Sequence, residues 1–315
     1  MHHDARRVNR RQALATLAGL GAAALWPQPA SPQNVKTKLI LLGTGGGPRP
    51  RTASSASAQV IVVDNTPYVI DCGNGVARQL VFAHVPLTSL RHIFITHHHS
   101  DHNADYGTLL QLAWAAGLAT RVDTWGPPPL EAITKSFFEM SATDINARIT
   151  DEGRVPLVPL VHAHELKGGG VVMRDENVNV TAAVVKHPPM VPSFGYRFDA
   201  HDRSIVISGD TALSENLIVL AKGADVLVHT AAYMPAVDRL VARVPNATNL
   251  RRTIVAGQTS VEDAGRVAQS AGVKTLVLSH LIPPDDDSVT DEMWIEAART
   301  TFRGAVVVAK DLMEI

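Results

Sequence analysis

Four side chains of metal-ligating type lie within six residues of this sequence, in the spacing His97-x-His99-x-Asp101-His102. They follow an apolar run at residues 93–95, which predicts a buried strand. Because side chains alternate along a strand, the first two ligand histidines face one side and the histidine between them faces the other. The chain then turns, so the aspartate and the last histidine can approach the same point. The set suits a divalent ion, zinc first, whereas the alternative is a polar loop that is merely rich in histidine.

Three later apolar segments each end in one more residue of ligand type. Residues 178–185 run into His187, residues 204–207 into Asp210, and residues 274–278 into His280. Each case is weak alone, because strands often end in polar residues. Together with the first cluster they follow one rule, in which an apolar strand is followed by a histidine or an aspartate at its end. Strands stacked in sheets would bring these strand ends to a single edge.

Composition describes an ordinary globular chain. Its 315 residues are 45% hydrophobic and 19% charged, enough for a sizeable core in one large domain or two small ones. A formal net charge of −1 without a long basic run does not indicate a protein built to hold nucleic-acid phosphates. The single cysteine, Cys72, excludes an internal disulfide. No repeat or linker divides the later chain, so we expect a single domain over residues 36–315.

Residues 1–30 resemble an export signal rather than part of the fold. Four arginines precede an apolar run of small residues at 13–25, which is too short for a comfortable transmembrane helix. The Asn-Arg-Arg-Gln-Ala-Leu segment at 9–14 resembles a twin-arginine signal, with a cleavage region near 29–31. We therefore expect a periplasmic or secreted protein with no membrane attachment in its mature form. The alternative is an uncleaved amphipathic N-terminal helix.

From residue 38 the pattern alternates between strands and helices. We expect strands at residues 38–42, 58–63, 68–70, 93–95, 178–185, 204–207, 226–228 and 274–278. We expect helices at residues 76–82, 106–118 and 130–140. The glycine-rich turn at 43–48 lacks the spacing and the following helix of a dinucleotide site. Residues 119–180 are less regular.

The ordered combination of motifs resembles the metallo-β-lactamase superfamily, and specifically its ribonuclease Z-like branch. The resemblance covers residues 38–310 and rests on LGTGG at 42–46, IDCG at 70–73, HxHxDH at 97–102, His187, PSFGYR at 192–197, SGDT at 208–211, and AGVK at 271–274 through His280. It implies an α/β fold, an αββα four-layer sandwich with a dinuclear metal site on one edge. By this resemblance, one ion is held by His97, His99 and His187, the second by Asp101, His102 and His280, and Asp210 bridges them.

Such a site implies two zinc ions, with manganese or iron as alternatives, and a metal-bridging hydroxide as the nucleophile of a hydrolase. Asp101 is a candidate catalytic residue as well as a ligand. His229, at the end of the strand 226–228, is a second catalytic candidate that could hydrogen-bond substrate, or it is structural. Asp71 could orient a ligand imidazole, and capping the following turn is the alternative.

Two departures from the ribonuclease Z pattern bear on the substrate. Where that branch carries a histidine thought to act in proton transfer, this chain has Gln258, which cannot exchange a proton at neutral pH. Its His-Glu-Ala-Thr segment is here His-Thr-Ala-Ala at 229–232, so the glutamate is missing. Residues 141–180 show no long basic arm. Transfer RNA is therefore not the expected substrate.

The main hypothesis is an exported dinuclear zinc hydrolase that acts on a small organic substrate through an ester, lactone, amide or related bond. The alternatives are a phosphodiesterase or ribonuclease Z-like nuclease, a hydrolytic dehalogenase, and a non-catalytic periplasmic metal-binding protein. The middle segment carries several large apolar side chains: Trp114, Trp125, Phe137, Phe138 and Met140. They favour an uncharged substrate if they line a pocket, but such a stripe of side chains more often belongs to the core. A small molecule is the expected partner, nucleic acid is not, and a homodimer is left open.

Overall fold

The computed structural model describes residues 37–315. The export segment over residues 1–30 and its cleavage region therefore lie outside the described residues. All described residues fall in one compact unit. Among the helices of this part of the chain, none is long and apolar enough to cross a membrane.

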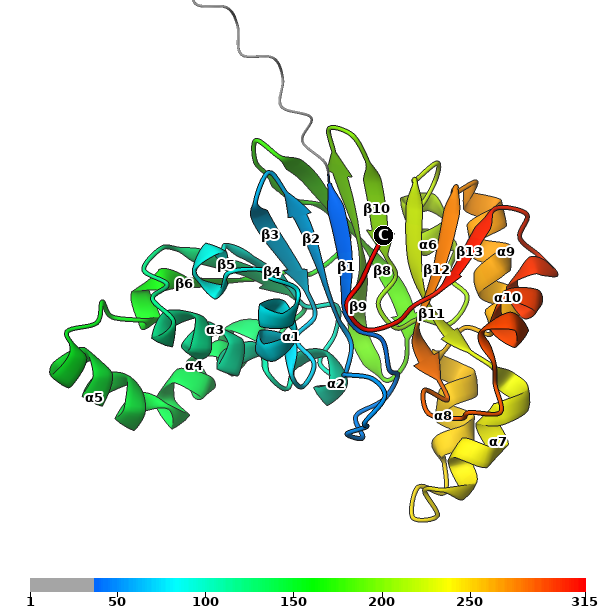
Figure 1. The fold of residues 1–315 in the computed structure, drawn as a ribbon, viewed down its shortest axis with the longest axis horizontal. Coiled ribbons are helices and arrows are strands. Elements are labelled where there is room, and N and C mark those ends of the chain that lie inside the picture. Colours follow the sequence, from blue (N-terminus) through cyan, green and yellow to red (C-terminus); the bar gives the residue numbers. More distant parts are fainter. Residues whose placement is uncertain (1–36) are drawn as a thin grey trace, which may run out of the picture. The chain divides into compact units, whose positions relative to one another are not determined.

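Two seven-stranded sheets pack face to face (Figure 1). The first has the order β14 (Met313–Glu314), β1 (Lys38–Gly43), β2 (Ala58–Val63), β3 (Thr66–Ile70), β4 (His92–Phe94), β5 (Val122–Gly126) and β6 (Val161–Glu165). The second has the order β13 (Ala305–Val308), β12 (Thr275–Ile282), β11 (Val226–Ala232), β10 (Ser204–Ile207), β9 (Met190–Ala200), β8 (Val178–His187) and β7 (Gly170–Arg174). With helices on both outer faces, this is the αββα sandwich, so the predicted fold is confirmed.

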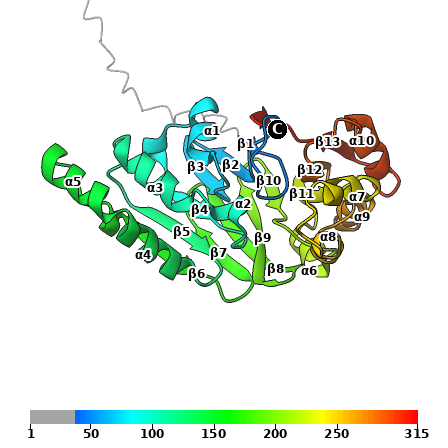
Figure 2. The same cartoon turned by 90° about the horizontal axis from the view of Figure 1, so that it is seen from below.

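Helices cover the outer face of each sheet (Figures 1 and 2). The first sheet carries α1 (Val76–Phe82), α3 (Tyr106–Ala115) and α4 (Leu130–Met140), followed by α5 (Ala142–Glu152). The second carries α6 (Glu215–Leu220), α9 (Val261–Ala271) and α10 (Asp291–Arg299). The short α2 (Ser100–Asn103) follows β4, and α7 (Met234–Ala242) and α8 (Leu250–Gly257) follow β11. These three helices lie outside the main layers and close to the strand ends.

Alternation along the central strands divides the core into layers. In β11, Val226 and Val228 join the cluster between the sheets, whereas Leu227 and Ala231 join the cluster under the helices of the second sheet. A strand that is buried on both faces reads as a continuous apolar run, as residues 226–228 do at the start of β11. Phe94 of β4 meets Phe198 of β9 edge to face with ring centroids 5.1 Å apart, which holds the two sheets in contact.

The structure differs from the predicted elements at several places. The helix predicted over residues 106–118 ends at Ala115, and α2 and α5 to α10 are not among the predicted helices. The strand predicted at residues 68–70 begins earlier, at Thr66, so the turn between β2 and β3 has only Asp64 and Asn65 at its centre. Both have positive φ, 46° and 62°, as a tight hairpin turn requires. The strand expected to end at residue 278 continues as β12 to Ile282, so His280 lies inside a strand.

Candidate metal centre

The first cluster of ligand-type side chains consists of His97, His99, His187 and Asp210, whose donor atoms lie within 4.8 Å of one another. The first two follow β4, His187 ends β8, and Asp210 follows β10. The Nε2 atoms of His97 and His187 each lie 3.1 Å from Nδ1 of His99. Three imidazole nitrogens that converge in this way can share one cation.

The second cluster consists of Asp101, His102 and His280. Asp101 and His102 lie on α2, and Oδ2 of Asp101 is 3.2 Å from Nε2 of His280. Asp210 borders this cluster as well, because its Oδ1 lies 3.4 Å from Nε2 of His102 and its Oδ2 lies 3.3 Å from Nε2 of His280. Asp210 thus lies between the two clusters, and the seven predicted ligands come together from five separate elements and loops.

Unusual backbone positions direct two of these side chains. Gly209 has φ of +59°, and a Cβ there would lie 2.7 Å from the carbonyl oxygen of Phe194, so only glycine fits before Asp210. His280 has φ of +46°, at the point where the register between β11 and β12 shifts. Such an irregularity turns a side chain away from the regular alternation of a strand. Here it brings His280 to Asp101 and Asp210.

Hydrogen bonds behind the clusters set the imidazole tautomers. Nδ1 of His102 donates to Oδ2 of Asp71 at 2.7 Å, and Asp71 is itself held by the amide and hydroxyl of Thr96. Nδ1 of His187 donates to the carbonyl of Gly257 at 2.7 Å. In the neutral ring, Nε2 of each histidine then carries a lone pair that points into its cluster, as a metal ligand requires. Asp71 is thus placed where it can orient His102.

Nine buried side-chain atoms in the described residues lack a hydrogen-bond partner, and two of them belong to the clustered ligand candidates. These two are Nε2 of His102 and Oδ1 of Asp210. Buried polar atoms are nearly always paired, because the desolvation of an unpaired group is costly. Cations within the clusters would satisfy both atoms, and a donor set of imidazoles and carboxylates is suited to zinc. The residues present therefore fit a dinuclear metal site.

Electrostatics in the centre favour bound cations. Burial acts to raise the pKa of Asp210, but the charges of His280 and His102 hold it well below the ordinary value. Burial acts to lower the pKa of His102, but the carboxylates of Asp210, Asp71 and Asp101 raise it well above the ordinary value. Buried carboxylates that stay ionised need compensating positive charge, and divalent ions can supply it in place of protons.

Gln258 links the two clusters through hydrogen bonds. Its Nε2 donates to Oδ2 of Asp210 at 2.6 Å, and its Oε1 accepts from the hydroxyl of Thr230 at 2.8 Å. The same hydroxyl oxygen lies 3.2 Å from Nδ1 of His280, which can donate to it. In the sequence, Thr230 and Gln258 stand out only as departures from the ribonuclease Z pattern. The structure places both against metal-ligand candidates. The one sequence signal for these contacts is that both residues lie in segments that correspond to motifs of that pattern.

His229, the second predicted catalytic residue, is not brought to the clusters. It is fully buried, and its Nδ1 donates to the carbonyl oxygen of Thr230 at 2.7 Å. Alternation along β11 puts it on the same face as Leu227 and Ala231, under the helices. Within residues 37–315, no hydrogen bond or ion pair joins it to the seven clustered side chains. Burial lowers its pKa to about 4, and its catalytic role stays a prediction.

The centre opens into a cavity of about 330 Å³. Five clustered side chains line it, namely His99, Asp101, His187, Asp210 and His280, together with Gln258 and Arg49. Its apolar lining comes from Leu240 and Val244 of α7 and the loop after it, Leu250 and Ile254 of α8, and Ile282 of β12. The aromatic residues of the middle segment do not contribute, since Trp114 and Trp125 are buried in cores.

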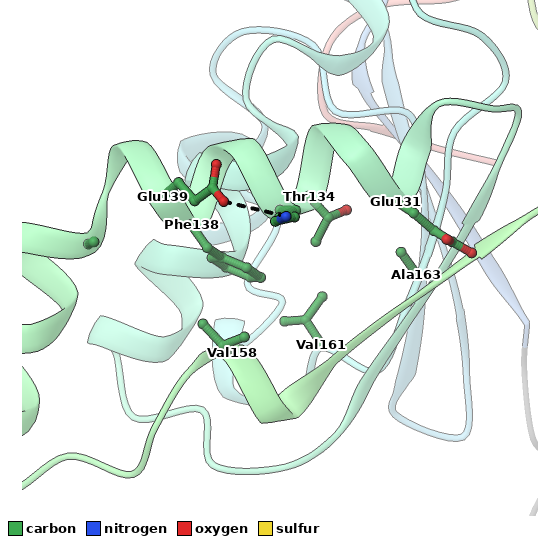
Figure 3. Close-up of a pocket in the computed structure, with 9 residues that line it drawn as sticks. Glu131, Thr134, Phe138, Glu139, Val158, Val161 and Ala163 are labelled. Atoms are coloured by element: carbon green, nitrogen blue, oxygen red, sulfur yellow. Dashed lines mark ion pairs between the residues drawn. The ribbon is translucent and has the colours of Figure 1, made fainter.

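A larger cavity of about 460 Å³ lies beside α4 and β6. Figure 3 shows Phe138 of α4 close to Val158 and Val161 in this cavity. None of the clustered side chains lines it, and the charged residues at its border are Glu131, Lys135 and Glu139 of α4. The smaller cavity, which has the candidate metal ligands in its wall, is therefore the candidate substrate pocket.

Comparisons with known proteins agree with this geometry. A family model described as Beta-lactamase superfamily domain matches residues 66–281. The chain is 30% identical over 281 residues to ribonuclease Z of Mycobacterium bovis (strain BCG / Pasteur 1173P2), covering 88% of this chain and 97% of the relative. Among solved structures, the metallo-beta-lactamase fold protein YhfI from Bacillus subtilis matches with a TM-score of 0.67 and 21% identity, over 89% of this chain and 98% of that one. The short form of human tRNase Z matches with a TM-score of 0.66 and 23% identity, over 88% and 98%.

Proposed function

The chain belongs to the metallo-β-lactamase superfamily, in its ribonuclease Z-like branch, and is a metal-dependent hydrolase; from this premise we propose that it is a two-metal phosphodiesterase. The observation that carries the proposal is the pair of adjoining clusters that share Asp210, with unpartnered buried atoms on His102 and Asp210. The relatives named ribonuclease Z support the phosphodiester alternative over the carboxylic esters, lactones and amides expected from the sequence. Zinc is the proposed ion, because most of the donors are imidazoles.

Two bound ions would supply Lewis acidity toward phosphoryl oxygens and lower the pKa of an attacking water. Hydrogen bonds within the chain position the ligand candidates for this chemistry. The amide of Gly47 donates to Oδ2 of Asp101 at 2.9 Å, and the Arg51 guanidinium donates to the carbonyl of Gly47 at 2.6 Å. These bonds fix Asp101 and the glycine turn beside the pocket. Asp71 holds His102 from the side away from the pocket, and Gln258, in the pocket wall, holds Asp210.

An assay of the metal-loaded protein tests the proposed reaction. Protein reconstituted with zinc is analysed for bound metal and assayed against bis-p-nitrophenyl phosphate, p-nitrophenyl butyrate and an aliphatic lactone. We expect close to two ions per chain and a kcat/KM for the phosphodiester at least tenfold above that for the carboxylic ester. The reverse preference would support the ester or lactone hypothesis. Two bound ions with no turnover of any substrate would support a non-catalytic metal-binding protein.

We also propose that the protein is exported by the twin-arginine route. Support comes from the sequence alone, from the paired arginines Arg10 and Arg11 before a short apolar run. Fractionation of cells that express the full chain should place it in the periplasm. Replacing both arginines by lysine should retain it in the cytoplasm, whereas unchanged distribution would contradict the proposal.

A further inference from the structure

The candidate substrate pocket has two chemically different sides. One side carries the metal-ligand candidates and Gln258, and the other is formed by α7, α8 and the end of β12. We call the second side the apolar wall and define it as Leu240, Val244, Leu250, Ile254 and Ile282. A substrate whose reacting group lies at the metal centre must therefore place a neighbouring group against this wall.

The apolar wall is a packed part of the fold. Leu240, Ile254 and Ile282 are only 5–7% exposed and form one cluster that ties α7, α8 and β12 together. Val244 and Leu250 are half-buried and line the same pocket. The buried members hold the wall in place, while the half-buried members leave apolar surface that a ligand can cover.

Three arginines of this helical pair and its connection are engaged by carboxylates, whereas the exposed Arg252 of α8 forms no ion pair among the described residues but does not line the pocket. The pairs are Arg239 with Asp286 at 2.8 Å, Arg243 with Asp285 at 3.5 Å, and Arg251 with Asp238 at 2.7 Å. Among the pocket-lining residues of the described chain the basic one is Arg49, which itself lies 3.8 Å from Asp285. Proteins that hold a polynucleotide contact its phosphates with many arginine and lysine side chains. This pocket instead offers hydrocarbon next to the metal centre.

The volume of the pocket limits the substrate further. About 330 Å³ lies at the lower end of the range for small-molecule sites, roughly 300–1,000 Å³. We propose that the substrate is a small phosphodiester with an alkyl or aryl group that lies against the apolar wall. This proposal rests on the proposed function, because it assigns the class of substrate for the same metal centre.

A series of p-nitrophenyl alkyl phosphates with methyl, butyl and octyl groups tests the proposal on the zinc-loaded protein. Each methylene that the wall buries should raise kcat/KM about fourfold, until the wall is covered. An RNA oligonucleotide of mixed sequence serves as the competing substrate. Equal kcat/KM across the alkyl series, or turnover of the RNA faster than of the best alkyl diester, would overturn the proposal.

A matched pair of variants on α8 locates the effect. Leu250→Ala removes apolar surface from the pocket and should lower the octyl-to-methyl ratio of kcat/KM at least tenfold. Val255→Ala is made on the same helix at a 50% exposed side chain that does not line the pocket, and it should leave the ratio unchanged. An equal loss of selectivity in both variants would count against the wall.

Binding separates failure of this proposal from failure of the proposed function. Calorimetry with methylphosphonate and octylphosphonate, on zinc-loaded and on chelated protein, needs no turnover. If bis-p-nitrophenyl phosphate is not hydrolysed but octylphosphonate binds at least tenfold more tightly than methylphosphonate, the pocket assignment holds and the reaction does not. If the diester is hydrolysed but the two phosphonates bind equally, the reaction holds and the apolar substrate class is wrong.

Discussion

Nε2 of Gln258 lies 2.6 Å from Oδ2 of Asp210, and the same side chain accepts a hydrogen bond from Thr230. Thr230 in turn lies within hydrogen-bonding distance of His280. One amide therefore restrains the carboxylate between the two clusters and, through a hydroxyl, a histidine of the second cluster. In this chain Gln258 and Thr230 stand where the ribonuclease Z pattern has histidine and glutamate, and their hydrogen bonds can position the ligand candidates.

The first prediction is that Gln258→Ala weakens metal binding. Loss of a hydrogen-bonding partner behind a ligand typically costs about 10- to 100-fold in metal affinity, and we expect a loss in this range by competition with a chromogenic chelator. Gln111→Ala is the control, because Gln111 bonds Asp144 on the surface, away from the centre. Equal affinities in both variants would show that the Gln258 contact has no role in metal binding.

A second prediction concerns Asp71. Its carboxylate accepts from Nδ1 of His102 and from the amide and hydroxyl of Thr96. Asp71→Asn introduces an amide that can donate to Nδ1, which would leave the proton of His102 on the nitrogen that faces the cluster. Metal affinity should fall about 10- to 100-fold. Asp225→Asn, at a carboxylate held by Ser204 and Lys274, is the control and should retain wild-type affinity.

The third prediction uses two neighbouring histidines. His99 faces His97 and His187, whereas Nε2 of His98 donates to the carbonyl of Pro127. His99→Ala should lose bound zinc and activity, and His98→Ala should keep both ions. Because bound metal stabilises the folded state, by about 2.7 kcal/mol at a hundredfold excess over Kd, only His98→Ala should show a Tm that falls on chelation. Wild-type zinc content and Tm in His99→Ala would contradict the ligand assignment.

The fourth prediction concerns acid stability and His229. Burial lowers the pKa of His229 from 6.5 to about 4. The unfolded chain takes up a proton near pH 6.5 and the folded chain only near pH 4, so stability is lost as the pH falls between these values. The loss amounts to about 3 kcal/mol, at about 1.4 kcal/mol per pKa unit. Urea unfolding of chelated protein between pH 7 and pH 4 should show a smaller loss for His229→Gln than for wild type. Equal losses in the two proteins would show that His229 does not titrate in this way.

The same variant tests the catalytic prediction for His229. If the residue acts only in the core, kcat/KM for bis-p-nitrophenyl phosphate at pH 7.5 should stay within about twofold of wild type. Thr230, and not His229, contacts the ligand candidate His280, so the substitution should leave the ligands unchanged.

Much of the centre was predictable from sequence because its signals are local. The spacing of His97, His99, Asp101 and His102 follows from strand alternation and one turn, which neighbouring residues decide. The rule that apolar strands end in His187 and Asp210 is also local. Together with the ordered motifs, these signals were sufficient for the superfamily, the layered fold and the residues that the structure gathers into two clusters.

Only the tertiary structure decided which side chains surround that centre. Alternation along β11 does not say whether His229 or Thr230 faces the metal-ligand candidates, since the register against β12 sets that choice. The contact of Asp101 with His280 spans 179 positions, and that of Gln258 with Asp210 spans 48. The apolar wall likewise arises because α7 and α8 pack beside the end of β12. Local pattern determined what each strand end carries, and long-range packing determined what each side chain meets, because contacts between distant segments depend on the whole fold.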